Sequence, residues 1–113
     1  MNRETVILFT RNGLGEGPAE LQRLLAQKFL LLLLENGDLP GKILFYTDGV
    51  RLACDGSPVL DALAALEARR VELVLCQTCL NAYGLSGSVK TGVVGGMGDI
   101  LQALSQAAKV IAM

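Results

Sequence analysis

The stretch Val71-Glu72-Leu73-Val74-Leu75-Cys76-Gln77-Thr78-Cys79 decides how this chain is expected to fold. Its first five residues are mainly apolar, which is typical of a strand that is covered on both faces. Leu80 to Tyr83 follow as a short helical stretch, and Gly84 ends it. In an open α/β sheet, ligands and chemistry lie at the carboxyl ends of the strands. We therefore expect Cys76 to stand where a functional site would form.

Further apolar runs on both sides of this stretch predict strands of the same kind. They cover Thr5 to Thr10, Lys42 to Thr47, Val89 to Val94 and Lys109 to Met113. Helical patterns lie between them, and this alternation is typical of right-handed βαβ crossovers. The expected fold is a single α/β domain over residues 1–113. It is a three-layer α/β/α arrangement with a mainly parallel sheet of about five strands.

The first predicted helix, from about Pro18 to Glu35, is unusually apolar. Leu21, Leu24, Leu25 and Leu32 form one apolar face, whereas Phe29 to Leu34 are apolar on every side. A helix that is apolar on every side is buried on every side. Two interpretations stay open, which are deep packing within one subunit and burial against a second copy. We favour the second and expect a homo-oligomer through Phe29 to Leu34.

Later segments are less clear in the sequence. Val50 to Asp55 is ambiguous and is assigned to an extended edge segment. A helix after Ser57-Pro58 has an apolar face with Val59, Leu63 and Leu66. In the last helix, Ile100, Leu101 and Leu104 are expected to be buried.

The composition excludes several classes of protein. The 113 residues carry a net charge of −1 and no basic cluster, which argues against nucleic acid and anionic lipid as partners. The longest apolar run, Phe29 to Leu34, is far shorter than the ~20 residues that a membrane helix needs. Three cysteines is an odd number, which a disulfide-stapled secreted fold would rarely use. We expect a cytoplasmic protein without a membrane segment.

The chain contains no histidine. This absence excludes Cys–His and Ser–His catalytic pairs and any metal site that needs histidine. A structural zinc site takes about four Cys or His ligands, and only three cysteines are present. We therefore expect no metal and no cofactor. An activated thiol would depend on backbone amides, a helix end, or a nearby lysine or arginine.

The cysteines differ in their expected roles. Cys76 precedes a helix start, where partial positive charge favours the thiolate that makes a cysteine nucleophilic. Cys79 has the two-residue spacing of redox dithiols and could resolve a persulfide or close a disulfide; packing on the short helix is the other interpretation. Thr78 and Tyr83 flank the pair as candidate hydrogen-bond donors to sulfur, although both could simply pack or cap. Cys54 lacks a helix terminus and is assigned to packing.

Glycines follow the first predicted strand in Gly13-Leu14-Gly15-Glu16-Gly17. The run fails the dinucleotide fingerprint, because Pro18 stands where the third glycine should be, and it lacks the Lys-Ser/Thr of a phosphate loop. These glycines are expected to let the loop turn sharply. The amides of Gly13 and Gly15 are also candidates for holding a small sulfur–oxygen or selenium–oxygen anion.

The run Cys76-Gln77-Thr78-Cys79-Leu80-Asn81-Ala82-Tyr83-Gly84-Leu85 resembles the signature of the DsrE/DsrF-like sulfur-relay family. It is most similar to the C-terminal domain of YedF-type selenium-metabolism proteins. The resemblance implies a parallel α/β domain, usually oligomeric, in which one cysteine carries sulfur as a persulfide. That cysteine lies eight positions before a glycine, as Cys76 does before Gly84. Cys79 matches the second cysteine of YedF-type members.

Two features depart from the resemblance. Gly96-Met97-Gly98-Asp99 stands where similar sequences tend to have Asn-Met-Tyr-Asp, so the aromatic residue is missing. YedF-type proteins also usually carry an N-terminal sulfur-carrier domain, and none precedes this module here. We expect such a domain to be encoded separately or to be absent from an excised piece.

The sequence therefore predicts a sulfur or selenium carrier that exchanges a sulfane atom with donor and acceptor proteins through Cys76. A thiol–disulfide oxidoreductase that uses Cys76 and Cys79 is the first alternative. The position of the CxxC after the third predicted strand, with no proline after Pro58, counts against it. A non-catalytic oligomeric partner protein with structural cysteines is the second alternative.

Overall fold

The computed structural model describes residues 1–113 and contains one sheet of five strands, all of which pair in parallel. In chain order the elements are β1 (Thr5–Phe9), α1 (Ala19–Asn36), β2 (Lys42–Phe45), the 3-10 helix η1 (Thr47–Ala53), α2 (Leu60–Ala68), β3 (Glu72–Cys76), α3 (Gln77–Ala82), β4 (Val93–Gly95), α4 (Met97–Gln106) and β5 (Lys109–Ala112). The strands are ordered β4-β3-β2-β1-β5. The parallel α/β fold predicted from the sequence is confirmed.

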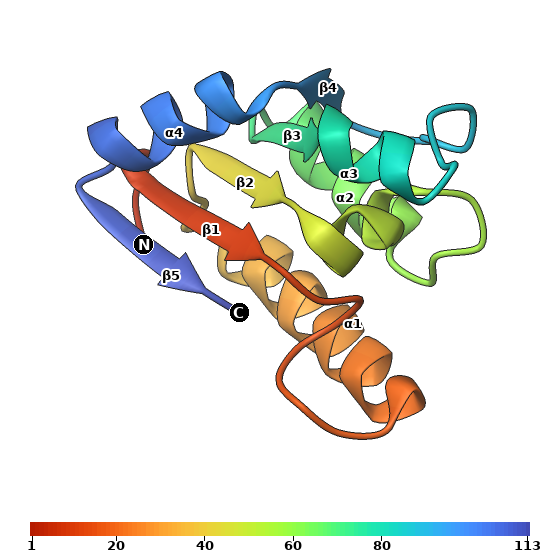
Figure 1. Ribbon diagram of the computed structural model, residues 1–113. Helices are drawn as coiled ribbons and strands as arrows, with labels where there is room; N and C mark the ends of the chain where they lie inside the picture. Colours follow the sequence, from red (N-terminus) through yellow and green to blue (C-terminus); the bar gives the residue numbers. More distant parts are fainter.

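The order of the strands explains where the helices lie. The chain moves from β1 through β2 and β3 to β4 in one direction, and then returns past the whole sheet to place β5 beside β1. Because βαβ crossovers are right-handed, this reversal puts the returning helix α4 on the face opposite α1. Figure 1 shows α1 on one side of the sheet and α4 on the other.

The strands form the centre of the apolar core. All five residues of β1 are buried, as are the last three residues of β2 and the last four of β3. The rings of Phe9 and Phe45, which end neighbouring strands, stack with their centroids 5.7 Å apart. The register pairs Phe9 with Phe45 and Phe45 with Leu75, so β1, β2 and β3 end side by side. Residues that follow these three strands therefore meet at one edge of the sheet.

Helix α1 presents the opposite face to the core from the one that its pattern suggests. Its buried residues are Ala26, Leu30 and Leu33. The predicted apolar face instead points outward, with exposed fractions between 41 and 56% for Leu21, Leu24, Leu25 and Leu32. Leucines occupy both sides of the helix, so periodicity alone could not decide which side packs inward. None of the helices combines the length and the apolar character needed to cross a membrane.

One further local prediction was wrong, and another was right only in part. Val50 to Asp55 was expected to be extended, but most of it belongs to η1, whose Val50 and Leu52 are buried against the core. The predicted strand at Val89 to Val94 is shorter, because only Val93–Gly95 pair with β3. Val89 instead forms an isolated antiparallel bridge with Cys54.

The helices after η1 agree better with their patterns. Val59, Leu63 and Leu66 are all buried, as predicted. In α4, Ile100 is fully buried but Leu101 is 64% exposed, contrary to the prediction. Ala103 is buried instead of Leu101 because the sheet-facing row of α4 runs through positions 100 and 103, three residues apart.

Candidate functional site

The cysteine pair lies where β3 ends and α3 begins. Cys76 is the last residue of β3 and the N-cap residue of α3, and its side chain is 0% exposed. Cys79 lies one turn further along, on α3, and is partly exposed. Both are free thiols. The pair therefore combines one thiol that solvent or a partner can reach with one that lies in the core.

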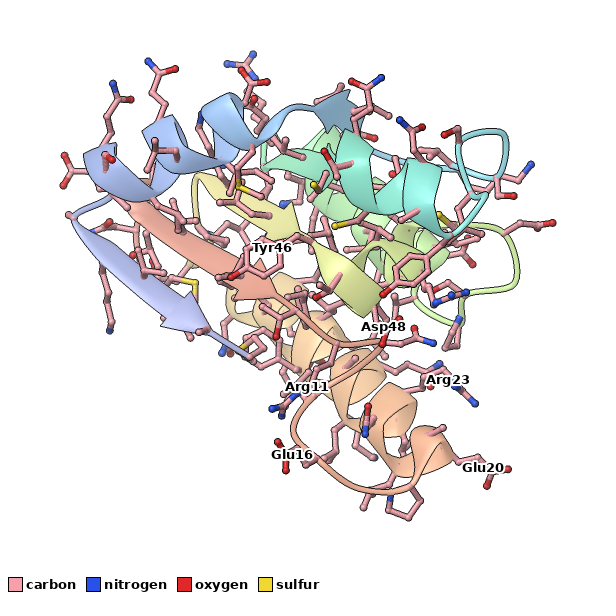
Figure 2. All side chains as sticks on the ribbon, viewed as in Figure 1. Arg11, Glu16, Glu20, Arg23, Tyr46 and Asp48 are labelled. Carbon is pink, nitrogen blue, oxygen red and sulfur yellow. The ribbon has the colours of Figure 1, made fainter.

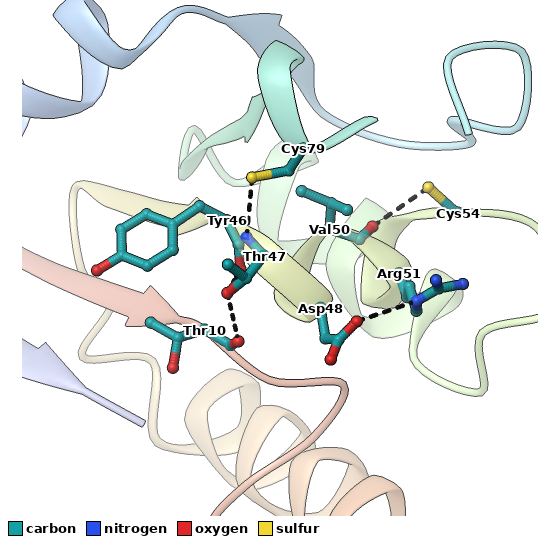
Figure 3. Close-up of polar contacts among 8 residues, drawn as sticks. All are labelled: Thr10, Tyr46, Thr47, Asp48, Val50, Arg51, Cys54 and Cys79. Carbon is teal, nitrogen blue, oxygen red and sulfur yellow. Dashed lines mark hydrogen bonds and ion pairs between the residues drawn. The ribbon is translucent and has the colours of Figure 1, made fainter. Parts of the chain in front are cut away.

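A backbone amide points at the accessible sulfur. The N–H of Thr47 donates to the Sγ of Cys79, with 3.0 Å between nitrogen and sulfur (Figure 3). Thr47 has φ +46°, a left-handed conformation that is uncommon for a β-branched residue. Its hydroxyl lies 2.8 Å from the carbonyl oxygen of Thr10, to which it donates. The side chain thus ties the turn after β2 to the end of β1 and holds the amide toward Cys79.

Close packing against β1 fixes the same turn. The amide of Tyr46 donates to the carbonyl of Phe9 over 3.1 Å, and the amide of Gly49 donates to the carbonyl of Tyr46 over 3.0 Å. A Cβ added to Gly49 would lie 2.1 Å from the carbonyl oxygen of Phe9. Only glycine fits where the two backbones come this close, so η1 packs directly on the end of β1.

The environment of Cys79 favours the protonated thiol. Burial makes the largest contribution and raises the pKa of Cys79, and the neighbouring thiol of Cys76 raises it further. The Thr47 amide acts in the opposite direction but does not prevail, so the pKa stays above the ordinary thiol value. Cys79 is therefore mostly a neutral thiol at pH 7 in the resting protein.

The raised pKa of Cys79 gives a pH-dependent prediction. Because only the thiolate is alkylated, the rate of alkylation at Cys79 should rise about tenfold per pH unit at every pH below that pKa. The measurement is iodoacetamide labelling of a variant that carries Cys54→Ser and Cys76→Ser, so that Cys79 is the one remaining thiol. A rate that is flat between about pH 6 and pH 8, as a lowered pKa would give, contradicts the prediction.

Tyr83 joins α3 to η1 rather than contacting sulfur. The nearby carboxylate of Asp48 is the main reason why the pKa of Tyr83 is raised. The guanidinium of Arg51 lies over the Tyr83 ring, 4.4 Å from its centroid, and its Nε donates to Asp48 over 3.3 Å. These three residues hold η1 against α3 and so support the contact between Thr47 and Cys79.

The remaining predicted residues donate no hydrogen bond to the sulfur of Cys76 or Cys79. Thr78 is exposed on α3, and its side chain makes no hydrogen bond. Gly13 and Gly15 lie in the loop before α1, with φ +140° and +70°. At Gly13 this loop packs on the backbone of Gln22, where an added Cβ would lie 2.3 Å from the carbonyl carbon. Both glycines serve the turn.

Cys54 is buried and packs as its surroundings suggested. Its side chain is 2% exposed, and its thiol donates to the carbonyl of Val50 over 3.2 Å. Burial raises the pKa of Cys54, although the charge of Arg51 lowers it in part. No group of three or more histidine, cysteine or carboxylate side chains is placed to hold a metal ion.

Sequence reasoning missed Thr47, Asp48 and Arg51, all of which lie on η1. The signal that could have found them is their position directly after β2. Strands β2 and β3 are neighbours, so residues that follow β2 must lie near residues that follow β3.

Comparison with known proteins finds one family model that matches the chain and solved structures that share its fold. The model of the DsrE/DsrF-like family matches residues 14–113. The crystal structure of the ychN protein from E. coli superimposes with a TM-score of 0.72 at 20% sequence identity, covering 100% of both chains. MTH1491 from Methanobacterium thermoautotrophicum, a protein of unknown function, gives 0.70 at 18% identity, covering 96% of this chain and 97% of its own. These two structures share the fold. No curated protein sequence matches the chain.

Proposed function

The chain belongs to the DsrE/DsrF-like family, which is associated with sulfur relay, and we propose that it carries a sulfane atom as a persulfide on the Cys76–Cys79 pair. The observation that carries this proposal is the Thr47 amide held on the Cys79 sulfur, beside a second thiol at the end of β3. Backbone donors of this kind stabilise sulfur anions where no histidine or metal is present. Selenium belongs to the same chemistry, because it also forms a bond to a thiol sulfur.

We assign the first contact with a donor to Cys79. The resemblance in sequence gives the persulfide to Cys76, but Cys76 is 0% exposed and a donor cannot touch it while α3 stays in place. In our proposal the Cys79 thiolate attacks the outer sulfur of a donor persulfide. A new S–S bond forms at Cys79, the S–S bond of the donor breaks, and the donor leaves as a thiol that takes up one proton.

The second step moves the sulfane atom to Cys76. The Cys76 thiolate attacks the outer sulfur of the Cys79 persulfide, so that Cys76 becomes the persulfide and Cys79 returns to a thiol. Cys79 follows Cys76 by three residues, about one turn along α3, which makes this transfer local. A persulfide on the buried Cys76 would be shielded from thiols in solution. Because the core is closely packed, an added sulfur there must push the first turn of α3 outward.

Another protein is a better donor or acceptor of the sulfane atom than a free small molecule. Five hollows open on the surface, and neither cysteine lines any of them. An accessible sulfur outside a pocket can be reached by the sulfur of another protein surface. A cytoplasmic location completes the proposal, because three free thiols are best kept in a reducing compartment.

Intact mass measurement after incubation with a persulfidated donor tests the function. The relay predicts the gain of one sulfur atom, which a reducing agent removes. A thiol–disulfide oxidoreductase, the second candidate, is favoured by the neighbouring thiols of Cys76 and Cys79, and it would instead lose two hydrogen atoms as a disulfide closes. A protein that gains no sulfur from any persulfide donor contradicts the relay.

We also propose that two copies of the chain associate through the outer face of α1. Leu31 and Leu32 are 51 and 56% exposed, and they continue the outward row of Leu21, Leu24 and Leu25. Lys28 and Glu35 border a shallow groove along the same row. Because about half of each side chain is still exposed, leaving these leucines in water forgoes roughly 0.8–1.5 kcal/mol per side chain that could be buried. A second copy offers the same apolar row, as a two-fold interface requires.

The charges on this row favour an antiparallel arrangement. Lys28 precedes the Leu31–Leu32 pair by about one helical turn, and Glu35 follows it by about one turn. A two-fold axis at Leu31 and Leu32 therefore places Lys28 of each copy opposite Glu35 of the other. Two reciprocal ion pairs then border an apolar centre, which is the usual anatomy of a protein interface.

Charge reversal tests this arrangement. Lys28→Glu should weaken association about tenfold, because it places like charges opposite each other at both ends of the interface. The double variant Lys28→Glu with Glu35→Lys should restore association by rebuilding both pairs. Sedimentation velocity at micromolar concentration gives the result. A parent protein that remains monomeric, or a double variant as weak as the single one, contradicts the antiparallel interface.

A further inference from the structure

Two of the surface hollows meet at a cluster of cations. One hollow, of about 430 Å³, lies between the loop after β1, the first half of α1 and η1. The other, of about 290 Å³, lies between η1 and the segment that leads to α2. The residues that line both are Asn12, Arg23 and Arg51. Two guanidinium groups and one amide thus converge on one place, with no carboxylate among the shared residues.

Much of the donor capacity at this place is unused. Arg23 makes no ion pair and no side-chain hydrogen bond. Arg51 donates to Asp48 through Nε alone, so both of its terminal nitrogens are free. Arg11 also faces the larger hollow, where it pairs with Glu16, whose side chain is 82% exposed. Figure 2 shows Arg11 in the loop after β1 and Arg23 on α1, with Asp48 above them.

The carboxylates around this place do not cancel its charge locally. Glu16 and Asp48 border the larger hollow and Asp55 borders the smaller one, so each hollow keeps an excess of one positive charge. The chain as a whole carries a net charge of −1. Only one lining residue of the larger hollow is apolar, and none of the smaller one is. An apolar ligand would find almost no surface to bury here.

We propose that Asn12, Arg23 and Arg51 form a binding site, the arginine hollow, for a small oxyanion of the sulfate, thiosulfate or selenite class. Planar guanidinium groups donate pairs of N–H bonds that match the oxygen atoms of such anions. The Asn12 side chain adds a neutral donor. The site goes beyond the proposed relay, because it binds the oxygen atoms of the ligand rather than a transferable sulfur.

The arginine hollow and the sulfur site both include residues of η1. Arg51 stacks on Tyr83, which follows Cys79 by about one turn of α3. Asp48, the ion-pair partner of Arg51, is the neighbour of Thr47, whose amide holds the Cys79 sulfur. One short element, η1, therefore forms a wall of both sites. An oxyanion that accompanies sulfane or selenium chemistry is the class of ligand that this placement suits.

Calorimetric titration of the reduced protein with sulfate tests the site. Sulfate has no transferable sulfur, so its binding does not depend on the relay. Saturable binding in the millimolar range is expected, and Arg23→Gln should weaken it at least about tenfold through the loss of charge-assisted bonds. Arg70→Gln removes the same charge elsewhere and should bind sulfate like the parent protein. Binding should weaken as chloride is added at constant sulfate.

A second variant tests the same site without changing either arginine. Asn12→Asp adds a carboxylate to the shared lining and should abolish sulfate binding while the far-UV spectrum stays that of the parent. Thiosulfate and selenite should then compete with sulfate for the parent protein. The inference is overturned if the parent binds no sulfate saturably, or if Arg23→Gln and Arg70→Gln bind it equally well. Neither result would affect the gain of a sulfane atom from a persulfide donor.

Discussion

Replacing Cys79 with serine should reduce the rate of persulfide loading by at least about a hundredfold, because a hydroxyl cannot replace the thiolate nucleophile. Cys79 is the partly exposed member of the pair, and its sulfur already accepts the Thr47 amide. The serine hydroxyl is smaller than the thiol and can accept the same amide, so the fold should be retained. Loading is measured as the mass gained from a persulfidated donor over time.

Two matched variants separate the roles of the thiols. Cys54→Ser should load like the parent, because Cys54 is buried beside Val50 and away from the pair. Cys76→Ser should still load, but the sulfur should stay on Cys79, where alkylating reagents reach it faster than in the parent. If Cys79→Ser loads at the parent rate, the donor reaches Cys76 directly, and α3 must open to admit it.

Replacing Gly49 with alanine should destabilise the protein by about 3 kcal/mol, a value at the upper end for overpacking. The new Cβ would lie 2.1 Å from the carbonyl oxygen of Phe9. Because that oxygen belongs to the backbone, no flexible side chain can move away to make room. The protein can relieve the clash only by lifting η1 from β1. That movement would also withdraw the Thr47 amide from Cys79, so loading should slow even in the folded fraction.

Urea unfolding measures this loss, and a second glycine provides the control. Gly98 lies in α4, and an added Cβ there meets nothing within 4 Å. Gly98→Ala should therefore leave stability unchanged or raise it by up to ~1 kcal/mol, because alanine favours a helix. Equal stability of the Gly49→Ala and Gly98→Ala variants would show that η1 is not seated on β1 as described.

The fold and the place of the cysteines could be predicted because they depend on local patterns. Continuous apolar runs specify strands that are covered on both faces, and the helical segments between them require parallel crossovers. The carboxyl end of such a strand is a fixed place in the architecture, so Cys76 could be located from its neighbours alone. The buried row Val59, Leu63 and Leu66 followed from helical periodicity in the same way.

The features that the sequence did not predict depend on contacts between segments that are distant in the chain. Thr47 acts on Cys79 across 32 positions of sequence, through a left-handed turn that its own residue type does not suggest. Helix α1 has leucines on both sides, and only its packing in three dimensions shows that Leu30 and Leu33 face inward. The arginine hollow joins Asn12, Arg23 and Arg51, which come from a loop, a helix and η1. No pattern within a single element contains such information.

Fragment mass spectrometry of the loaded protein tests the central proposal most directly. Trypsin cleaves after Arg70 and Lys90, so Cys76 and Cys79 lie on one peptide while Cys54 lies on another. After native loading and trapping with an alkylating reagent, the account predicts one extra sulfur on the peptide that spans residues 71–90. The sulfur should appear first on Cys79 and later on Cys76. Extra sulfur found only on Cys54, or on no cysteine at all, would contradict the account.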